Sequence, residues 1–132
     1  MEKFDLLVKI LGDLHKAGIL KYLVLVGSWC QDFYRYQFDN PPEIPAAKTM
    51  DVDLLIPSRL PKIDPPVDIV TIMKNNDFIF NIGLQSGLYK FEHPLLEVDF
   101  LTDCGAKRTE DTRYFTQLGV TAARVALHKY AA

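Results

Sequence analysis

The sequence predicts an α/β domain whose small mixed β-sheet is flanked by helices. Three observations support this. Apolar residues recur at helical spacing near the N-terminus, two short aliphatic runs read as strands, and from Phe78 onward the pattern alternates with a period of two. The resulting order is helix, strand, helix, strand, helix and then several strands, which is typical of an α/β domain.

The N-terminal part predicts two helices around one strand. Phe4, Leu7, Leu11 and Leu14 are spaced for one helical face, and Gly18 is the expected C-terminal cap. The run "KYLVLVGS" predicts a buried strand that stops at a glycine. The segment "SWCQDFYRYQF" has aromatic residues on one helical face, so we expect a second helix there, capped by its first serine.

The middle of the chain predicts a loop, a strand and a helix. Three prolines between Asp39 and Lys48 indicate a loop. A second strand is expected from Val52 to Ile56, where Pro57 stops it. The segment "DPPVDIVTIMKNN" predicts a helix capped by Asp64, with proline in its first turn and two asparagines at its end.

The C-terminal part predicts strands followed by a helix. "FIFNIG", "GLYKFEH" and "LLEVDFL" alternate with a period of two and are separated by glycines and by His93-Pro94. From Thr116 to Ala132, the pattern in "VTAARVALHKY" predicts a final helix.

Length and composition limit the class of protein. The 132 residues suit one domain, 1–132, which is either minimal or the N-terminal part of a longer protein, and a net charge of −2 gives no overall basic field for nucleic acid. Cys30 and Cys104 are too few for a disulfide framework. No stretch approaches the ~18 apolar residues of a membrane span, and the mixed-charge N-terminus is unlike a secretory signal. We therefore expect a cytoplasmic protein without a membrane partner.

Acidic residues interrupt two of the predicted strands. Asp51 and Asp53 are two residues apart and therefore point to the same face of a strand, as do Glu97 and Asp99. Carboxylates so close repel one another, and a divalent cation with a preference for hard oxygen ligands, Mg²⁺ or Mn²⁺, would relieve that repulsion. The competing interpretation is that Asp51 and Asp53 are solvated and only cap a loop at the strand start.

A glycine and a serine end the first predicted strand. Backbone N–H groups at a helix N-terminus after Gly27-Ser28 are suited to hold a phosphate, although the same residues also suit an ordinary turn.

Together, "YLVLVGSWC", "TMDVDLLIP" and "LEVDFLT" resemble motifs of the nucleotidyltransferase superfamily that includes DNA polymerase β. They look most like its small prokaryotic branch, which includes members related to toxin–antitoxin systems. The resemblance covers roughly the chain from Tyr22 onward. The chain departs from the family in a longer segment between Ser28 and Asp51 and in the presence of Trp29 and Cys30, where smaller or basic residues are commoner.

The resemblance implies a nucleotidyltransferase-like fold and an Mg²⁺- or Mn²⁺-dependent transferase. It would move an NMP from an NTP, such as ATP, to a hydroxyl acceptor and release pyrophosphate. Asp51 and Asp53 would hold two ions, and Asp99 would share the ion that activates the acceptor. Gly27 and Ser28 would bind the β- and γ-phosphates. The acceptor is left open between a small molecule, an RNA end and a protein hydroxyl.

Two other functions compete with this one. The chain would also suit a weakly catalytic or non-catalytic antitoxin that binds a toxin-like protein partner. A glycosyltransferase would use an Asp-x-Asp pair, but the chain is too short for that fold and Gly27-Ser28 would be unexplained. The role of Glu97 beside Asp99 is left open as well.

Overall fold

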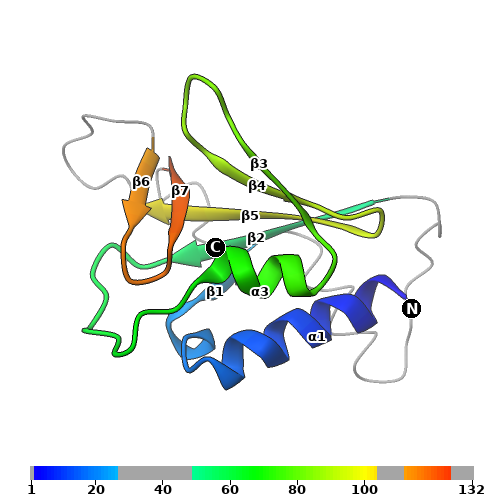
Figure 1. Ribbon diagram of the computed structural model, residues 1–132, viewed down its shortest axis with the longest axis horizontal. Helices are drawn as coiled ribbons and strands as arrows, with labels where there is room; N and C mark the ends of the chain where they lie inside the picture. The colour runs from blue at the N-terminus through cyan, green and yellow to red at the C-terminus, as the bar shows by residue number, and fades with distance from the viewer. Residues whose placement is uncertain (1, 27–48, 104–111, 126–132) are drawn as a thin grey trace.

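The computed structural model of the chain describes residues 2–26, 49–103 and 112–125 and has a mixed α/β architecture (Figure 1). Within these residues, two α-helices lie below a sheet of seven strands in the view of Figure 1. The elements in chain order are α1 (Lys3–Lys16), the short 3₁₀ helix η1 (Leu20–Tyr22), β1 (Val24–Val26), β2 (Met50–Ile56), α3 (Ile69–Asn75), β3 (Ile79–Ile82), β4 (Tyr89–Glu92), β5 (Leu96–Asp103), β6 (Thr112–Phe115) and β7 (Val120–Val125).

The sheet is mixed, as the sequence predicts. Its strand order is β1-β2-β5-β4-β3, and β7 pairs with both β5 and β6. The pairs β2–β5 and β5–β7 are parallel, and the other pairs are antiparallel. Strand β5 therefore lies at the centre, with β2 along one edge and with β4 and β7 sharing the other.

Helix α1 confirms the prediction for the N-terminus. The Glu2 and Asp5 side chains form a capping box at its start, and Gly18, at a φ of +83°, follows its end. Its apolar stripe packs under the sheet, where burial of each large side chain contributes roughly 1.5–3 kcal/mol. The fully or almost fully buried residues of this stripe are Phe4, Leu6, Leu7, Ile10 and Leu14.

The first strand is less buried than the sequence suggests. Strand β1 has only three residues and follows η1, and Val24 is 53% exposed. Among the described residues β1 pairs with β2 alone, so it is an edge strand and the prediction of a buried strand is wrong.

Helix α3 begins later than predicted. Its N-cap is Asp68, whose carboxylate accepts hydrogen bonds from the Thr71 N–H and hydroxyl, so the assignment of the cap to Asp64 is wrong. The preceding residues are extended because the Val67 N–H donates to the Gln117 carbonyl at 2.9 Å. The predicted end of the helix is confirmed, with Asn76 as the C-cap.

The last described segment corrects the prediction of a C-terminal helix over residues 116–125, and residues 126–132 of that prediction lie outside the described residues. Residues 112–125 form the antiparallel hairpin β6–β7, with Gly119 at a φ of +64° in its turn. Val120 and Ala122 are fully buried, and the end of β7 pairs with β5 from Leu101 to Asp103. A short apolar run fits either a helix or a strand. Here the run forms a strand because it pairs with β5, which is distant in sequence.

The remaining predictions divide into confirmed and undescribed ones. Strands β2, β3, β4 and β5 confirm the four predicted strands of the middle region. The predicted helix from Ser28 and the predicted loop from Asp39 to Lys48 lie outside the described residues. Within the part of the chain that the structure describes, no helix is long and apolar enough to cross a membrane.

Candidate functional site

The two acid-bearing strands are neighbours in the sheet. Strands β2 and β5 run parallel over their whole common length, with Asp51 paired to Glu97 and Asp53 paired to Asp99. Neighbouring strands lie about 4.8 Å apart, so each pair brings two carboxyl groups within reach of one ligand. The fold thus places four acidic residues in two short rows on one face.

Hydrogen bonds at both ends fix this register. At the start, the Met50 N–H donates to the Leu95 carbonyl and the Thr49 hydroxyl donates to the Pro94 carbonyl, both at 3.1 Å. At the far end, the buried Thr102 hydroxyl donates to the Ile56 carbonyl at 2.8 Å. A shift by one residue would turn every side chain of β2 to the opposite face, so these bonds and the apolar pattern hold the acids in place.

Strand β4 adds a third residue to each of the two rows. Lys90 pairs with Asp99, and Glu92 pairs with Glu97. We call the side of the sheet that carries these residues the acid face, defined by Asp51, Asp53, Lys90, Glu92, Glu97 and Asp99. One row therefore reads Asp53–Asp99–Lys90 and the other Asp51–Glu97–Glu92.

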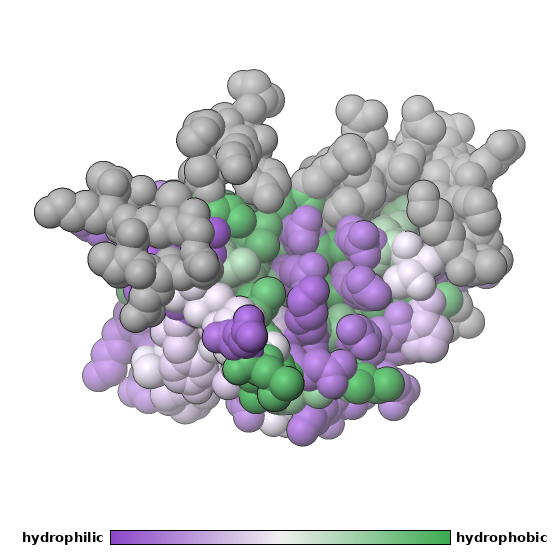
Figure 2. Space-filling view, turned by 90° about the horizontal axis from the view of Figure 1, so that it is seen from above, coloured by the Kyte–Doolittle hydropathy of each residue, from purple (hydrophilic) through white to green (hydrophobic). Residues whose placement is uncertain are grey.

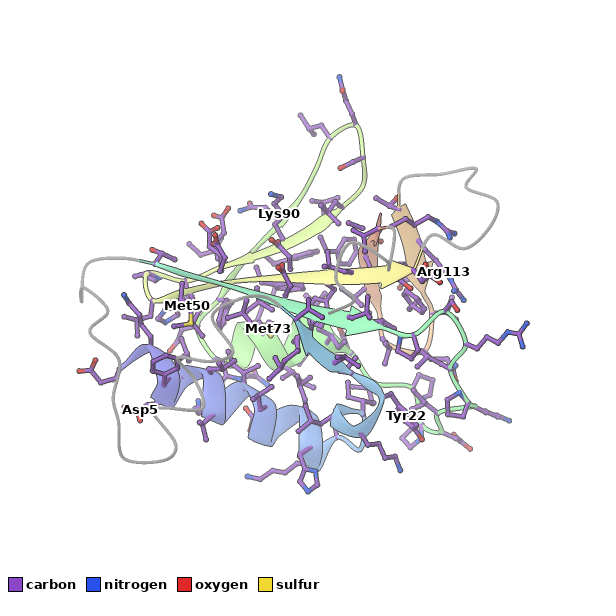
Figure 3. All side chains as sticks on the ribbon, turned by 180° about the vertical axis from the view of Figure 1, so that it is seen from behind. Asp5, Tyr22, Met50, Met73, Lys90 and Arg113 are labelled. Carbon is purple, nitrogen blue, oxygen red and sulfur yellow. The ribbon has the colours of Figure 1, made fainter. Side chains whose placement is uncertain are left out.

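Figures 2 and 3 show a polar surface above the sheet. Seen from above, hydrophilic side chains gather in a band across the middle of the described surface (Figure 2). From behind, Lys90 lies above β5, whereas Met73 of α3 lies below the sheet (Figure 3). The acid face is thus on the opposite side from the helices.

Burial and mutual repulsion act on the row Asp53–Asp99. Partial burial raises the pKa of Asp53, and the charges of Asp99 and Asp51 raise it further. Burial also raises the pKa of Asp99, where the positive charge of Lys90 acts in the opposite direction and lowers it. Asp51 and Glu92 add repulsion at Asp99. The ionised pair is therefore disfavoured until a cation or proton arrives.

The row Asp51–Glu97 behaves in the same way. Desolvation is the largest cause that raises the pKa of Glu97, followed by the charge of Asp51. A hydrogen bond with the Asp51 carboxylate favours the protonated form of Glu97 and raises its pKa further. Glu97 therefore belongs to the same electrostatic cluster as Asp51, and the prediction that it shares a face with Asp99 is confirmed.

The donor set suits a hard divalent cation. Carboxylate oxygens are the ligands that Mg²⁺ and Mn²⁺ prefer, and a cation would relieve the repulsion that raises these pKa values. Among the described residues, however, no group of three or more His, Cys, Asp or Glu side chains stands arranged to hold a metal ion. The fit to Mg²⁺ therefore rests on donor chemistry and on the register of β2 and β5.

The sequence-based candidates are placed as follows. Asp51, Asp53 and Asp99 come together on the acid face. Gly27 and Ser28, the predicted phosphate-binding residues, lie outside the described residues. Sequence reasoning missed Lys90 and Glu92, although the alternation in "YKFEH" and the short turn before β5 would have placed both on the acid face.

We compared the chain with known proteins. No protein-family model matches it, and neither the curated proteins nor the solved structures gave a match.

Proposed function

We propose that this protein is an Mg²⁺-dependent nucleotidyltransferase that transfers an NMP from an NTP to a hydroxyl acceptor. One observation carries the proposal: Asp53 and Asp99 pair directly across two parallel strands, with Asp51 on the same face. Three carboxylates in this arrangement suit the phosphoryl chemistry that divalent cations support.

The three aspartates divide two tasks. Asp51 and Asp53 lie on one strand and would hold the cation that binds the triphosphate. Asp99 lies one strand away, opposite Asp53, and would share with it a second cation that activates the acceptor hydroxyl. Bound Mg²⁺ would neutralise the triphosphate and lower the pKa of that hydroxyl.

The reaction needs no covalent intermediate with the protein. The acceptor oxygen forms a bond to the α-phosphorus, the bond from that phosphorus to the bridging oxygen of the β-phosphate breaks, and pyrophosphate leaves. The hydroxyl proton passes to solvent. The contribution of the chain is positioning and electrostatic stabilisation, which is what phosphoryl transfer chiefly requires.

The raised carboxyl pKa values support this assignment. Structural acids at a strand surface are usually solvated, whereas Asp53 and Asp99 are partly buried, and the charges of Asp99 and Asp51 raise the pKa of Asp53. Perturbed carboxylates gathered on one face are a recurrent feature of functional sites. A bound cation would offset the repulsion between these charges, and relief of the repulsion would strengthen cation binding.

The test combines activity with binding. The protein is incubated with Mg²⁺ and each NTP labelled at the α-phosphate, and both pyrophosphate and labelled product are measured. Asp53→Asn is expected to lower the rate at least about 10²–10³-fold, because it removes a charge that acts directly on the reacting groups. Glu92→Gln is the matched control, since it removes a carboxylate from the same face that the proposal does not use.

Two results would contradict the proposal. One is a wild-type protein that neither releases pyrophosphate nor gains thermal stability with any NTP and Mg²⁺. The other is an Asp53→Asn protein as active as Glu92→Gln.

A further inference from the structure

Strand β3 forms an edge of the sheet and is exposed along it. Among the described residues β3 pairs only with β4, and the loop that joins the two strands projects above the sheet (Figure 1). The Thr112 hydroxyl donates to the Ser86 carbonyl of this loop at 3.1 Å. Ile79 is 63% exposed, Ile82 is 53% exposed, and Leu84 at the hairpin tip is completely exposed. This hairpin thus carries half of the large apolar side chains that stand exposed in the described chain.

The backbone of β3 offers hydrogen-bonding groups on its outer side. The Gly83 N–H donates to the Leu88 carbonyl at 2.9 Å, which fixes the phase of the hairpin. In an antiparallel pair bonded and non-bonded positions alternate, so Ile79 and Asn81 bond to β4. The N–H and C=O groups of Phe80 and Ile82 therefore point outward, where another strand can pair with them.

The edge lacks the devices that usually prevent strand association. Natural edge strands carry charged residues, prolines or bulges that block a second strand. The twelve residues from Phe78 to Tyr89 contain no charged residue and no proline. Strand β6, which pairs only with β7 among the described strands, carries Arg113. Strand β3 is therefore open to pairing in a way that β6 is not.

The charge pattern suits a second copy of this chain as the partner. Around a two-fold axis the central residue meets its own copy and the residues on either side meet each other's, so charges of one sign in the strand would lie close to like charges. Strand β3 avoids this completely, and the net charge of −2 adds little repulsion between two copies. The strand is thus electrostatically compatible with itself.

We propose that two copies associate through antiparallel pairing of their β3 strands around a two-fold axis at Asn81. In this register the outward groups of Phe80 bond to those of Ile82 in the second copy, which also sets an aromatic ring beside a β-branched side chain. The two Asn81 amides face each other. Each donates one N–H to Glu92 of its own copy at 3.4 Å and keeps a second N–H and its carbonyl oxygen for the other copy. Ile79 faces Gly83 of the second copy, where the Ser86 hydroxyl occupies the position that a side chain of residue 83 would take.

This inference does not depend on the proposed function. The dimer would have one continuous sheet through both copies. The apolar side chains of the hairpin would contact the second copy instead of water. Burial of apolar surface at about 25 cal/mol per Å² would support the pairing.

The first test is the mass in solution by analytical ultracentrifugation over a concentration series. The wild-type protein is expected to reach about twice its 15.0 kDa chain mass. Asn81→Lys is expected to remain a monomer, because it places two ammonium groups at the axis. Gln85→Lys is the matched control: it adds the same charge at an exposed position in the hairpin loop and should still dimerise.

A second variant addresses hydrogen bonding instead of charge. Ile82→Pro removes an outward N–H that the protomer does not use, and proline is tolerated at such edge positions. It should also be monomeric, with an unchanged far-UV circular dichroism spectrum. A wild-type protein that stays monomeric at about 100 μM, or an Asn81→Lys protein that dimerises like Gln85→Lys, would overturn the inference.

The register has its own test. In a background with both cysteines replaced by serine, Asn81→Cys should form a disulfide-linked dimer on mild oxidation, because non-bonded antiparallel pairs have Cα atoms about 4.5 Å apart. Gln85→Cys should not cross-link at a comparable rate. Equal cross-linking of the two variants would contradict the axis at Asn81.

Discussion

The two faces of strands β2 and β5 differ in chemistry although the same two strands build both. Toward the helices both strands present buried side chains, of which Val52, Leu54, Val98 and Phe100 are at most 1% exposed. Away from the helices lie the carboxylates of the acid face. The apolar face fixes the register, and that register in turn brings the acids together at a cost in electrostatic repulsion. Stability and proposed function therefore reside on opposite sides of the same two strands.

The largest effect is expected on the apolar face. Phe100 is fully buried and packs edge-on against Phe91 at a ring-centroid distance of 5.7 Å. Phe100→Ala should lower the free energy of unfolding by about 3–5 kcal/mol, because it removes apolar contact and leaves a cavity. Chemical denaturation measures this value. A loss below about 1 kcal/mol would mean that this side of β5 does not hold the sheet to the helices.

A change on the acid face should have the opposite sign. Asp53→Asn removes a charge that is repelled by Asp99 and Asp51, so the metal-free protein should become more stable. For partly solvated charges the gain is a few tenths to about 1 kcal/mol. The same denaturation experiment without divalent cations measures it. A clear loss of stability would show that Asp53 has a structural partner rather than a site role.

The pH dependence should separate the faces further. Asp53 and Asp99 have folded-state pKa values raised above the ordinary aspartate value of 3.8. Above that value the folded state holds more protons than the unfolded state, so stability falls as the pH rises through the raised pKa values. The stability difference between Asp53→Asn and wild type should therefore be smallest in acid and grow toward neutral pH. A difference that shrinks over this range would contradict the repulsion.

The smallest effect concerns Lys90. Its charge lowers the pKa of Asp99, so Lys90→Gln should raise that pKa. Carboxyl NMR titration measures it. Lys9→Gln, an exposed change on α1, is the control and should leave Asp99 unchanged. An unchanged Asp99 in Lys90→Gln would mean that the side chain points away from the acid face.

Local patterns were sufficient for part of this arrangement. Helix α1, strands β2 to β5, and the shared faces of Asp51 with Asp53 and of Glu97 with Asp99 follow from periodicity alone, because spacing along a strand decides which face a side chain joins. The pairing of Asp53 with Asp99 specifically, and of Lys90 with Asp99, depends on register between separate segments, which no local pattern specifies.

The errors have the same origin. The predicted C-terminal helix failed because "VTAARV" suits either structure, and the parallel contact of β7 with β5 decides. The start of α3 moved from Asp64 to Asp68 because backbone bonds to Gln117 and Leu118 hold the preceding residues extended. In both cases contacts between distant residues overrode a local preference.

The most direct test of the acid face is a crystal structure with Mn²⁺ and a non-hydrolysable NTP analogue, using anomalous scattering to locate the metal. The account predicts a Mn²⁺ peak about 2.0–2.2 Å from carboxylate oxygens of both Asp53 and Asp99. Density for the analogue with no metal between these two residues, or carboxylates turned away and bound by lysine or arginine, would contradict it.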